Sequence, residues 1–253
     1  MIAGLPMYLR PENTGAHRRL WNRTREALAE QGIAAPEHLD TGADIWALWQ
    51  DPDLLLAQTC SLPFRATLEG RVALVGAPDH ALPGCDAGEY YSLFVTRADE
   101  TPRPLAEYAR ARLAFNDPMS QSGWAAPQSL AHALGFQFVN LVQTGAHRAS
   151  ALAVAEGRAD LAAIDAVSWT MMTRWDAFTD RLQVIGRTSA TPALPYITAC
   201  GQHAAAIRQA MNTALSRLSD IDCRDLGMAR IVVAERARYL SLPIPTPPCQ
   251  PKQ

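Results

Sequence analysis

The chain has 253 residues, 48% hydrophobic and 19% charged, which suits a soluble globular protein of one or two domains with a sizeable core. Its formal net charge of −2 argues against a nucleic-acid-binding protein, because such proteins usually present a basic surface. The only lysine is Lys252, so an anion site in this chain must use arginine, histidine, hydroxyls or backbone N–H groups.

The number and spacing of the cysteines exclude further classes of protein. The five cysteines form no CxxC pair and no metal-like spacing, so we expect no metal, no other cofactor and no full disulfide framework. They are Cys60, Cys85, Cys200, Cys223 and Cys249.

No stretch approaches the roughly 20 apolar residues of a membrane span. The stretch MIAGLPMYLRPE lacks a basic n-region, so either the protein is cytosolic or a leader lies outside this sequence.

In the first part of the chain, short apolar runs predict buried strands and amphipathic stretches predict helices. The expected strands are residues 2–8, 53–58, 71–78 and 89–99. The expected helices are 14–31 and 44–50, and 59–64 is expected to be a loop.

The same alternation continues from residue 112. The expected strands are 112–116, 136–145, 159–165 and 181–188. The expected helices are 122–134, interrupted by Pro127, then 147–157, 166–175, 202–218 and 224–240. Strands that alternate with helices predict an α/β fold with mostly parallel sheets, in which ligands bind at the carboxyl ends of the strands.

Three polar segments follow expected strands: QTCSLP from Gln58, NDPMSQSG from Asn116, and TGAHRAS from Thr144. In the second segment, Ser120 and Ser122 stand where a helix begins. Unpaired N–H groups and the positive end of the helix dipole favour an anion there. The alternative is an ordinary serine cap. The segment is not GxxxxGK[ST], so a nucleotide-type phosphate loop is not indicated.

Two further positions allow two interpretations each. His147 lies at or just before a first helical turn and can donate to an anion, with Ser150 one turn along, or it is structural. Asp165 ends an expected strand and either accepts from a ligand or caps the next helix. Four tyrosines are candidate walls of a cleft or simple packing residues: Tyr8, Tyr90, Tyr91 and Tyr196.

Five stretches in this order resemble the phosphate, phosphite and phosphonate substrate-binding proteins of ABC transporters, the PhnD-like family. They are LLLAQTCSLPF, YYSLFVTRAD, AFNDPMSQSG, TGAHRASALAVAEGRADLAAIDAVSW and PALPYITACG, and the likeness runs from about residue 2 to about residue 215.

The resemblance implies a two-lobed type II periplasmic-binding-protein fold with two hinge strands. Lobe 1 would comprise residues 1–95 and 197–253, and lobe 2 residues 96–196. It also implies that a small phosphorus oxyanion binds between the lobes for uptake through a transporter permease. The implied ligand-binding residues are Tyr8, Gln58, Thr59, Tyr91, Asn116, Ser120, Gln121, Ser122, His147 and Asp165.

The sequence departs from the family's pattern at two points, and two alternative functions stay open. Ser61 stands where many relatives have glycine, and no leader is seen, although the resemblance implies a periplasmic protein. One alternative is a cytosolic anion sensor or interaction module with the same fold. The other is a hydrolase that uses Ser122, His147 and Asp165 as a triad, although the chain has no GxSxG motif.

Overall fold

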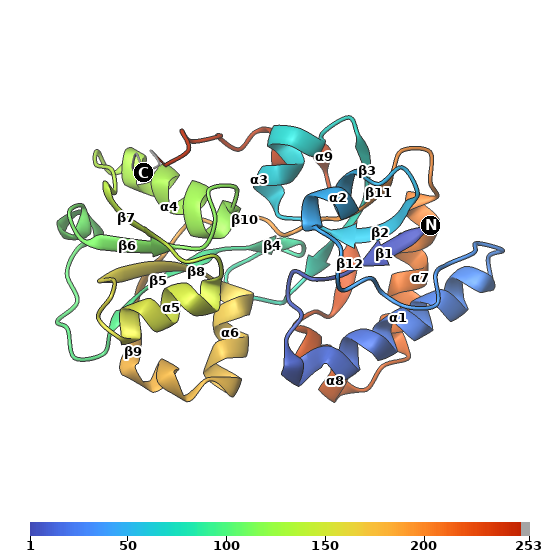
Figure 1. Cartoon of the computed structure of the whole chain (residues 1–253), viewed down its shortest axis with the longest axis horizontal. Coiled ribbons are helices and arrows are strands. Elements are labelled where there is room, and N and C mark those ends of the chain that lie inside the picture. The colour runs from blue at the N-terminus through green and yellow to red at the C-terminus, as the bar shows by residue number, and fades with distance from the viewer. Residues whose placement is uncertain (249–253) are drawn as a thin grey trace. The chain divides into compact units, whose positions relative to one another are not determined.

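A computed structural model describes residues 1–248, and its elements fall into two compact units (Figure 1). Unit 1 contains residues 1–89 and 192–241, and unit 2 contains residues 90–191 and the described tail from residue 242. The chain passes between the units where two short strands pair, β4 (Glu89–Tyr90) and β10 (Thr191–Pro192).

These units differ at their edges from the lobes expected from the sequence. In the described residues, β5 (Ser92–Arg97) pairs with strands of unit 2, and β11 (Tyr196–Ala199) pairs with strands of unit 1. The first crossing therefore precedes β5 instead of dividing it after residue 95, and the second precedes β11 by several residues. Residues 242–248 belong with unit 2 and not with unit 1, whereas residues 249–253, including Cys249 and Lys252, lie outside the described residues.

Unit 1 is built on a mixed five-stranded sheet in the order β1-β2-β11-β3-β12. Its remaining strands are β1 (Ile2–Gly4), β2 (Leu54–Gln58), β3 (Val72–Asp79) and β12 (Arg230–Val232). β1 runs parallel to β2, whereas β11 is antiparallel to both β2 and β3. β1, β2 and β3 therefore run in one direction, and the loops after them leave the same edge of the sheet.

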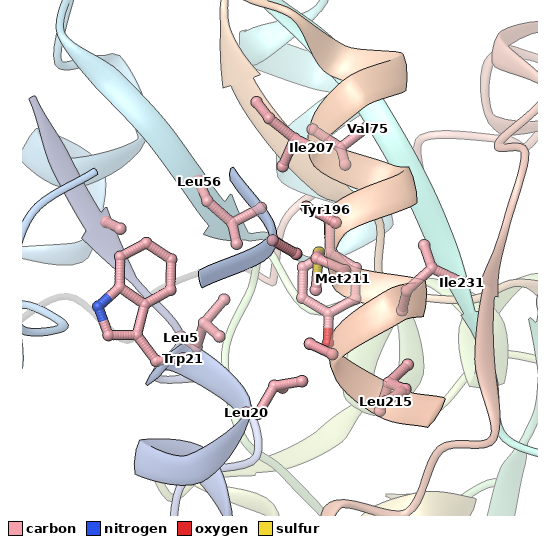
Figure 2. Close-up of a cluster of buried hydrophobic side chains, with 14 of the residues drawn as sticks. Leu5, Leu20, Trp21, Leu56, Val75, Tyr196, Ile207, Met211, Leu215 and Ile231 are labelled. Atoms are coloured by element: carbon pink, nitrogen blue, oxygen red, sulfur yellow. The ribbon is translucent and has the colours of Figure 1, made fainter. Parts of the chain in front are cut away.

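In its described residues, unit 1 has eight helical segments, and its longer helices α1 and α7 bury one side each in the core. The segments are η1 (Pro11–Asn13), α1 (Thr14–Ala29), α2 (Ile45–Gln50), α3 (Ser61–Pro63), η2 (Phe64–Leu68), α7 (Ala204–Ser216), α8 (Asp220–Leu226) and α9 (Arg236–Leu240). Ile207, Met211 and Leu215 are four residues apart on α7 and share one face. Figure 2 shows them with Leu20 and Trp21 of α1 and with Tyr196 in one buried cluster.

Unit 2 has a second mixed five-stranded sheet, in the order β7-β6-β8-β5-β9. Its remaining strands are β6 (Arg112–Phe115), β7 (Asn140–Gln143), β8 (Leu161–Asp165) and β9 (Leu182–Arg187). β6 is parallel to both β7 and β8, and β5 is antiparallel to β8 and β9. The expectation of mostly parallel sheets is therefore wrong for both units, because the strands that follow each crossing insert in the opposite direction.

Both faces of the second sheet are covered, as the unbroken apolar run of β8 requires. Ala162 and Ile164 point to the cluster under α5, and Leu161 and Ala163 point to a cluster with Phe94. The helices are η3 (Leu105–Tyr108), η4 (Gln121–Ala125), α4 (Ala126–Ala133), α5 (His147–Ala155), α6 (Ala166–Trp175) and η5 (Ala177–Arg181).

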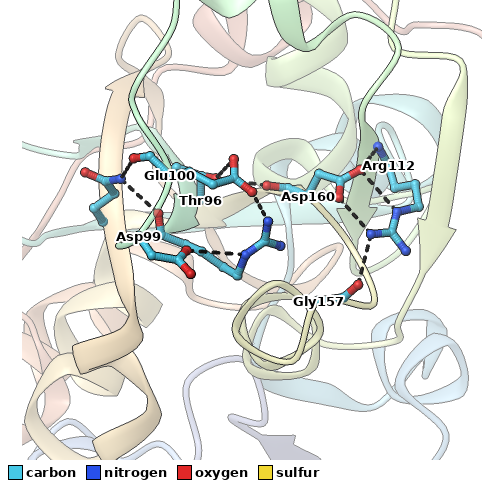
Figure 3. A network of polar contacts seen from close by, with 8 residues as sticks. Thr96, Asp99, Glu100, Arg112, Gly157 and Asp160 are labelled. Carbon is cyan, nitrogen blue, oxygen red and sulfur yellow. Dashed lines mark hydrogen bonds and ion pairs between the residues drawn. The ribbon is translucent and has the colours of Figure 1, made fainter.

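A polar network ties together the edge of this sheet at which β6 and β8 begin (Figure 3). The guanidinium of Arg112 forms two hydrogen bonds with the carboxylate of Asp160 (2.7 and 3.1 Å) and one with the carbonyl of Gly157 (2.9 Å). The Thr96 hydroxyl lies within hydrogen-bond distance of both the Glu100 carboxylate (3.0 Å) and the Asp160 carbonyl (3.1 Å) and shares its one proton between them. Ionic contacts therefore fix the starts of the strands, and the opposite edge, where β6 and β8 end, is free of this network.

Two regions differ from the predicted secondary structure. The expected loop 59–64 contains the helical turn α3, which continues as the π-helix η2 to Leu68. The expected helix 224–240 is interrupted by β12, because Gly227 ends α8 in a left-handed conformation (φ 67°) and β12 pairs with β3. Long-range strand pairing has overridden the local helical pattern there.

Candidate functional site

Most of the expected site residues lie where the central strands of unit 2 end. β6, β7 and β8 are parallel, so the loops that follow them meet at one edge of the sheet. We call this set of residues the carboxyl edge of unit 2; it consists of Asn116, Ser120, Gln121, Ser122, His147 and Asp165.

The serine-rich segment forms the start of a helix, as its sequence predicts. The hydroxyl oxygen of Ser120 accepts a hydrogen bond from the Gly123 N–H (3.0 Å), and the helix starts as the π-helical segment η4 before α4 continues it. The helix is continuous, and Pro127 lies within the first turn of α4 instead of interrupting it. Ser120 therefore caps the helix and still has its own O–H available as a donor.

Two hydroxyls and an imidazole converge at this helix start. The Oγ atoms of Ser120 and Ser122 are 3.4 Å apart, and Ser122 Oγ lies 2.8 Å from His147 Nε2. Ser122 and His147 come from loops that follow different strands, so the contact depends on the parallel pairing of β6 with β7. The structure thus brings together Ser120, Ser122 and His147, three candidate anion donors of the sequence.

Gly123 allows a close approach between the helix start and the end of β6. A Cβ atom on Gly123 would lie 1.9 Å from Asn116 Oδ1, a distance at which one of the two must move. Asn116 is also tied to the loop before α5, because its carbonyl accepts from the Gly145 N–H (2.9 Å). Asn116 therefore links the two loops that carry Ser122 and His147.

His147 is a neutral imidazole at physiological pH. Burial lowers its pKa to about 4, and the Ala163 backbone opposes this shift only in part. Its Nδ1 is buried and has no side-chain hydrogen-bond partner among the described residues. The side chain therefore offers Nε2 to Ser122 or to a ligand without bringing a positive charge.

Asp165 caps α6, which was one of its two expected roles. One carboxylate oxygen accepts from the N–H groups of Val167 (2.8 Å) and Ser168 (2.9 Å). The N–H of Ala166 donates to the carbonyl of Tyr91 (3.1 Å), so Tyr91 is held close to this cap. A direct ligand contact by Asp165 or Tyr91 stays a prediction.

Sequence reasoning missed Ser92, a buried residue that holds the start of the helix carrying Ser122. The fully buried Ser92 hydroxyl donates to the Ser122 carbonyl (2.8 Å), and Ser92 pairs with Asp165 across β5 and β8. Its only sequence signal is a small polar residue at the start of an apolar run. Ser92 therefore connects Ser122 with the Asp165 cap, which lies on the neighbouring strand.

Two polar residues near His147 contact other protein groups. The Ser150 hydroxyl lies 2.6 Å from the Thr144 hydroxyl, and a ligand contact by Ser150 stays a prediction. Arg148 forms an ion pair with Asp176 (2.8 Å) and points elsewhere. Gln121 is buried at the first position of η4, and its ligand contact stays a prediction.

In unit 1, the amide and hydroxyl expected at the end of β2 are engaged with backbone groups. The Gln58 side chain donates to the Leu194 carbonyl (3.1 Å) and the Thr59 hydroxyl donates to the Cys60 carbonyl (3.3 Å). Both residues are almost fully buried. Their local role is to hold the loop after β2, and a ligand contact stays a prediction.

Tyr8 lies in the loop after β1, on the same sheet edge of unit 1 as Gln58. Its ring meets His80 edge to face, with centroids 5.6 Å apart, and its carbonyl accepts from the Asn13 side chain (2.9 Å). Tyr196, in contrast, lies in the apolar core of unit 1, where its hydroxyl contacts Met228 (Figure 2). Of these two tyrosines, only Tyr8 stays a candidate ligand contact.

Residues 1–248 contain no group of three or more histidine, cysteine, aspartate or glutamate side chains that could hold a metal ion. No helix in this part of the chain is both long and apolar enough to cross a membrane.

A family model described as the periplasmic phosphonate substrate-binding protein of ABC transporters matches residues 70–239. No curated protein matches the chain.

Solved structures extend the likeness to nearly the whole chain. PhnD1 from Prochlorococcus marinus MIT 9301 in complex with methylphosphonate has a TM-score of 0.72 at 15% identity, covering 94% of each chain. XAC2383 from Xanthomonas citri bound to ATP has a TM-score of 0.67 at 15% identity, also covering 94% of each chain. A binding protein component of a phosphonate ABC transporter, PA3383 from Pseudomonas aeruginosa, has a TM-score of 0.66 at 15% identity, covering 94% of this chain and 82% of that one. The chain therefore has the type II periplasmic-binding-protein fold.

Proposed function

Because the chain belongs to the phosphonate-binding family of periplasmic substrate-binding proteins of ABC transporters, we propose that the carboxyl edge of unit 2 holds the oxygens of a small phosphorus oxyanion. The observation that carries this proposal is the contact of 2.8 Å between Ser122 Oγ and His147 Nε2 at a capped helix start. The ligand is phosphate, phosphite or a phosphonate.

Two kinds of donor support the oxyanion at this edge. The hydroxyls of Ser120 and Ser122 can donate, and His147 can donate when its proton is on Nε2. Each hydrogen bond to a charged group contributes about 1.5–3 kcal/mol. A few such bonds suffice for tight binding of a desolvated anion.

The donors carry no formal positive charge, which suits the binding of an anion by fixed dipoles. His147 is neutral, and the carboxyl edge of unit 2 as defined contains no arginine or lysine. Dipoles fixed by the fold replace the ligand's hydration shell without reorganisation. Such a site releases its ligand more readily than an arginine clamp, which is useful for delivery to a transporter.

The remaining expected residues complete the proposal. Tyr8, Gln58 and Thr59 of unit 1 are further proposed ligand contacts, which follow β1 and β2 at one edge of that sheet. Tyr91 and Asp165 would border the oxyanion from β5 and β8, because both lie next to Ser92, which bonds Ser122.

We propose that this edge binds its ligand without turnover. A hydrolytic triad needs a carboxylate that orients the histidine through its second nitrogen. Among the described residues, His147 Nδ1 has no side-chain hydrogen-bond partner, and Asp165 directs one oxygen to the N–H groups of α6. The hydroxyl–imidazole pair therefore lacks the third member that would make Ser122 a nucleophile.

We place the working protein in the periplasm, where a permease of the same transporter receives the ligand. Family membership supports both statements. Cell fractionation and copurification with the permease would check them.

The first experiment is a thermal-shift panel on protein that has been unfolded, dialysed and refolded to remove bound anion. The panel contains phosphate, phosphite, methylphosphonate, 2-aminoethylphosphonate and sulfate. A ligand at 100 times its Kd stabilises the folded state by about 2.7 kcal/mol, which raises the Tm clearly. A shift with a phosphorus oxyanion and none with sulfate supports the proposal, and no shift with any of the phosphorus compounds would contradict it.

A further inference from the structure

The carbonyl of Ser122 lies at a gap in the hydrogen bonding of its own helix. In the π-helical segment η4, an N–H group donates to the carbonyl five residues earlier, as the Ala126 N–H does to the Gln121 carbonyl. The next donor in this pattern would come from Pro127, which has no N–H group. The π-helical pattern therefore leaves the carbonyl of the buried Ser122 without a donor, which is unfavourable unless another group supplies one.

A side chain from another strand of unit 2 supplies this donor. The buried hydroxyl of Ser92, in β5, donates to the Ser122 carbonyl (2.8 Å). The backbone of Ser92 is itself fixed by Thr188, which follows β9. The Ser92 N–H donates to the Thr188 hydroxyl (3.0 Å), and the Thr188 N–H donates to the Ser92 carbonyl (2.9 Å). The Ser92 hydroxyl therefore reaches the helix from a backbone position that is held by two further bonds.

The bond from Ser92 acts on a peptide group that carries both serines of the proposed anion site. The C=O of Ser122 and the N–H of Gly123 belong to one planar peptide group, so they move together. Its C=O accepts from Ser92, and its N–H donates to Ser120 Oγ (3.0 Å). One rigid group thus joins the Ser92 hydroxyl to the backbone of Ser122 and to the side chain of Ser120.

We propose that Ser92 is a positioning residue of the oxyanion site, whose hydroxyl replaces the helix bond that Pro127 cannot make and so sets the direction of the Ser122 and Ser120 hydroxyls. The inference rests on the proposed function, since it takes these two hydroxyls as donors to the anion. Ser92 acts through Ser122 and needs no contact with the ligand, because its single hydroxyl proton is used by the Ser122 carbonyl.

The first test is titration calorimetry of Ser92→Ala with phosphate, phosphite and methylphosphonate, after removal of bound anion. The alanine keeps the backbone pairs of β5 and removes only the hydroxyl. For the anion that wild type binds most tightly, the affinity should fall about tenfold, and by no more than in Ser122→Ala, because the donors are misdirected but still present.

The matched control is Thr96→Val, which removes another buried hydroxyl of β5, at the opposite edge of the sheet (Figure 3). It should lower the stability to urea and leave the anion affinity unchanged. Calorimetry is carried out where urea unfolding shows each variant to be fully folded, so that a loss of affinity is not a loss of folded protein.

A rescue variant tests the reason for the bond. Pro127→Ala adds an N–H group five residues after Ser122, where the π-helical pattern can use it. Alone it should bind like wild type, because the Ser92 bond is still present. In Ser92→Ala/Pro127→Ala the new N–H should restore the affinity to within about threefold of wild type, since it returns the one missing bond. No recovery in the double variant would overturn the inference.

A double-mutant cycle separates positioning from a purely structural role. In a Ser122→Ala background the main hydroxyl that Ser92 directs is gone, so adding Ser92→Ala should lower the affinity by less than about threefold. The loss of stability caused by Ser92→Ala should be the same in both backgrounds. A tenfold loss of affinity in the Ser122→Ala background as well would show that Ser92 does not act through Ser122, and would overturn the inference.

The outcomes separate the two proposals. If wild type binds one of the three anions and Ser92→Ala binds it equally well, the role of Ser92 is refuted and the proposed function stands. If wild type binds none of them, the proposed function fails and this inference fails with it.

Discussion

The two units carry polar residues at corresponding sheet edges but use them differently. At the carboxyl edge of unit 2, the hydroxyl of Ser122 lies within hydrogen-bond distance of a side chain from another loop, His147, at a helix start. At the edge of unit 1, Gln58 and Thr59 donate to nearby carbonyls. His80 Nε2, in contrast, has no hydrogen-bond partner among the described residues.

This difference separates a proposed binding edge from an edge that holds its own loop. An oxyanion needs donors, and the site proposed in unit 2 has hydroxyls that can donate to it. The amide and hydroxyl of unit 1 are engaged with backbone carbonyls and hold the loop after β2.

The largest effect should follow Gly123→Ala. The new Cβ would lie 1.9 Å from Asn116 Oδ1, so the helix start or the β6 loop must shift and several donors lose their geometry. We expect phosphonate affinity to fall by about 100-fold or more, since each bond to the anion is worth about 1.5–3 kcal/mol. Titration calorimetry measures the change.

Gly186→Ala is the control for this variant, because a Cβ there meets nothing within 4 Å. It should bind like wild type. Near-normal affinity of Gly123→Ala would mean that the helix start is not where the anion binds.

Removing one donor should cost less than displacing the helix start. His147→Ala and Ser122→Ala should each lower the affinity for the oxyanion about 10- to 100-fold, the equivalent of one bond to a charged group. Because the two side chains contact each other, the double variant should lose less than the sum of the two effects. His132→Ala, at an exposed position of the same unit, is the matched control. Unchanged affinity in both single variants would refute the assignment.

A substitution at the edge of unit 1 should change the free energy of unfolding more than the affinity for the oxyanion. Gln58→Ala leaves the buried Leu194 carbonyl without its side-chain donor, which should lower the free energy of unfolding by about 1–3 kcal/mol. Urea denaturation measures this loss, and calorimetry on the same protein measures affinity. A loss of affinity as large as that of Ser122→Ala, with unchanged stability, would instead make Gln58 a direct ligand contact.

A last expected effect concerns pH and involves one histidine in each unit. The pKa values of His80 and His147 are lowered from 6.5 to about 4 in the folded protein. Between these values the unfolded chain binds protons that the folded chain does not, so stability falls as the pH is lowered from 6.5 towards 4. Each histidine adds at most about 1.4 kcal/mol per pH unit to this slope.

Urea unfolding at several pH values checks this prediction. His80→Asn and His147→Asn should each flatten the slope between pH 6.5 and 4, and the exposed His132→Asn should not. A slope that neither buried-histidine substitution changes would show that other groups cause the acid sensitivity.

Much of the fold follows from local patterns in the sequence. Helix 14–31 was predicted within two residues of α1, and the predicted helix 166–175 coincides with α6. These elements depend on apolar spacing, on an aspartate cap such as Asp165, and on glycines that end helices, all of which act over a few residues. The serine-rich helix start is a local signal of the same kind.

Other features depend on contacts between residues far apart in the chain. β12 forms where a helix was expected because it can pair with β3, and β5 and β11 run antiparallel to their neighbours. The prediction of mostly parallel sheets failed for this reason. No local pattern encodes the partner or direction of a strand.

The sequence by itself determined the family, the α/β class and the helix starts that carry Ser122 and His147, because these depend on residue types in short stretches. Only the tertiary structure decided what each polar group contacts. It joined Ser92 to Ser122 across 30 residues and His80 to Gly227 across 147 residues. It also turned Gln58 towards a backbone carbonyl. A hydrogen bond needs its partners about 3 Å apart, and for residues this distant in sequence only the folded chain sets that distance.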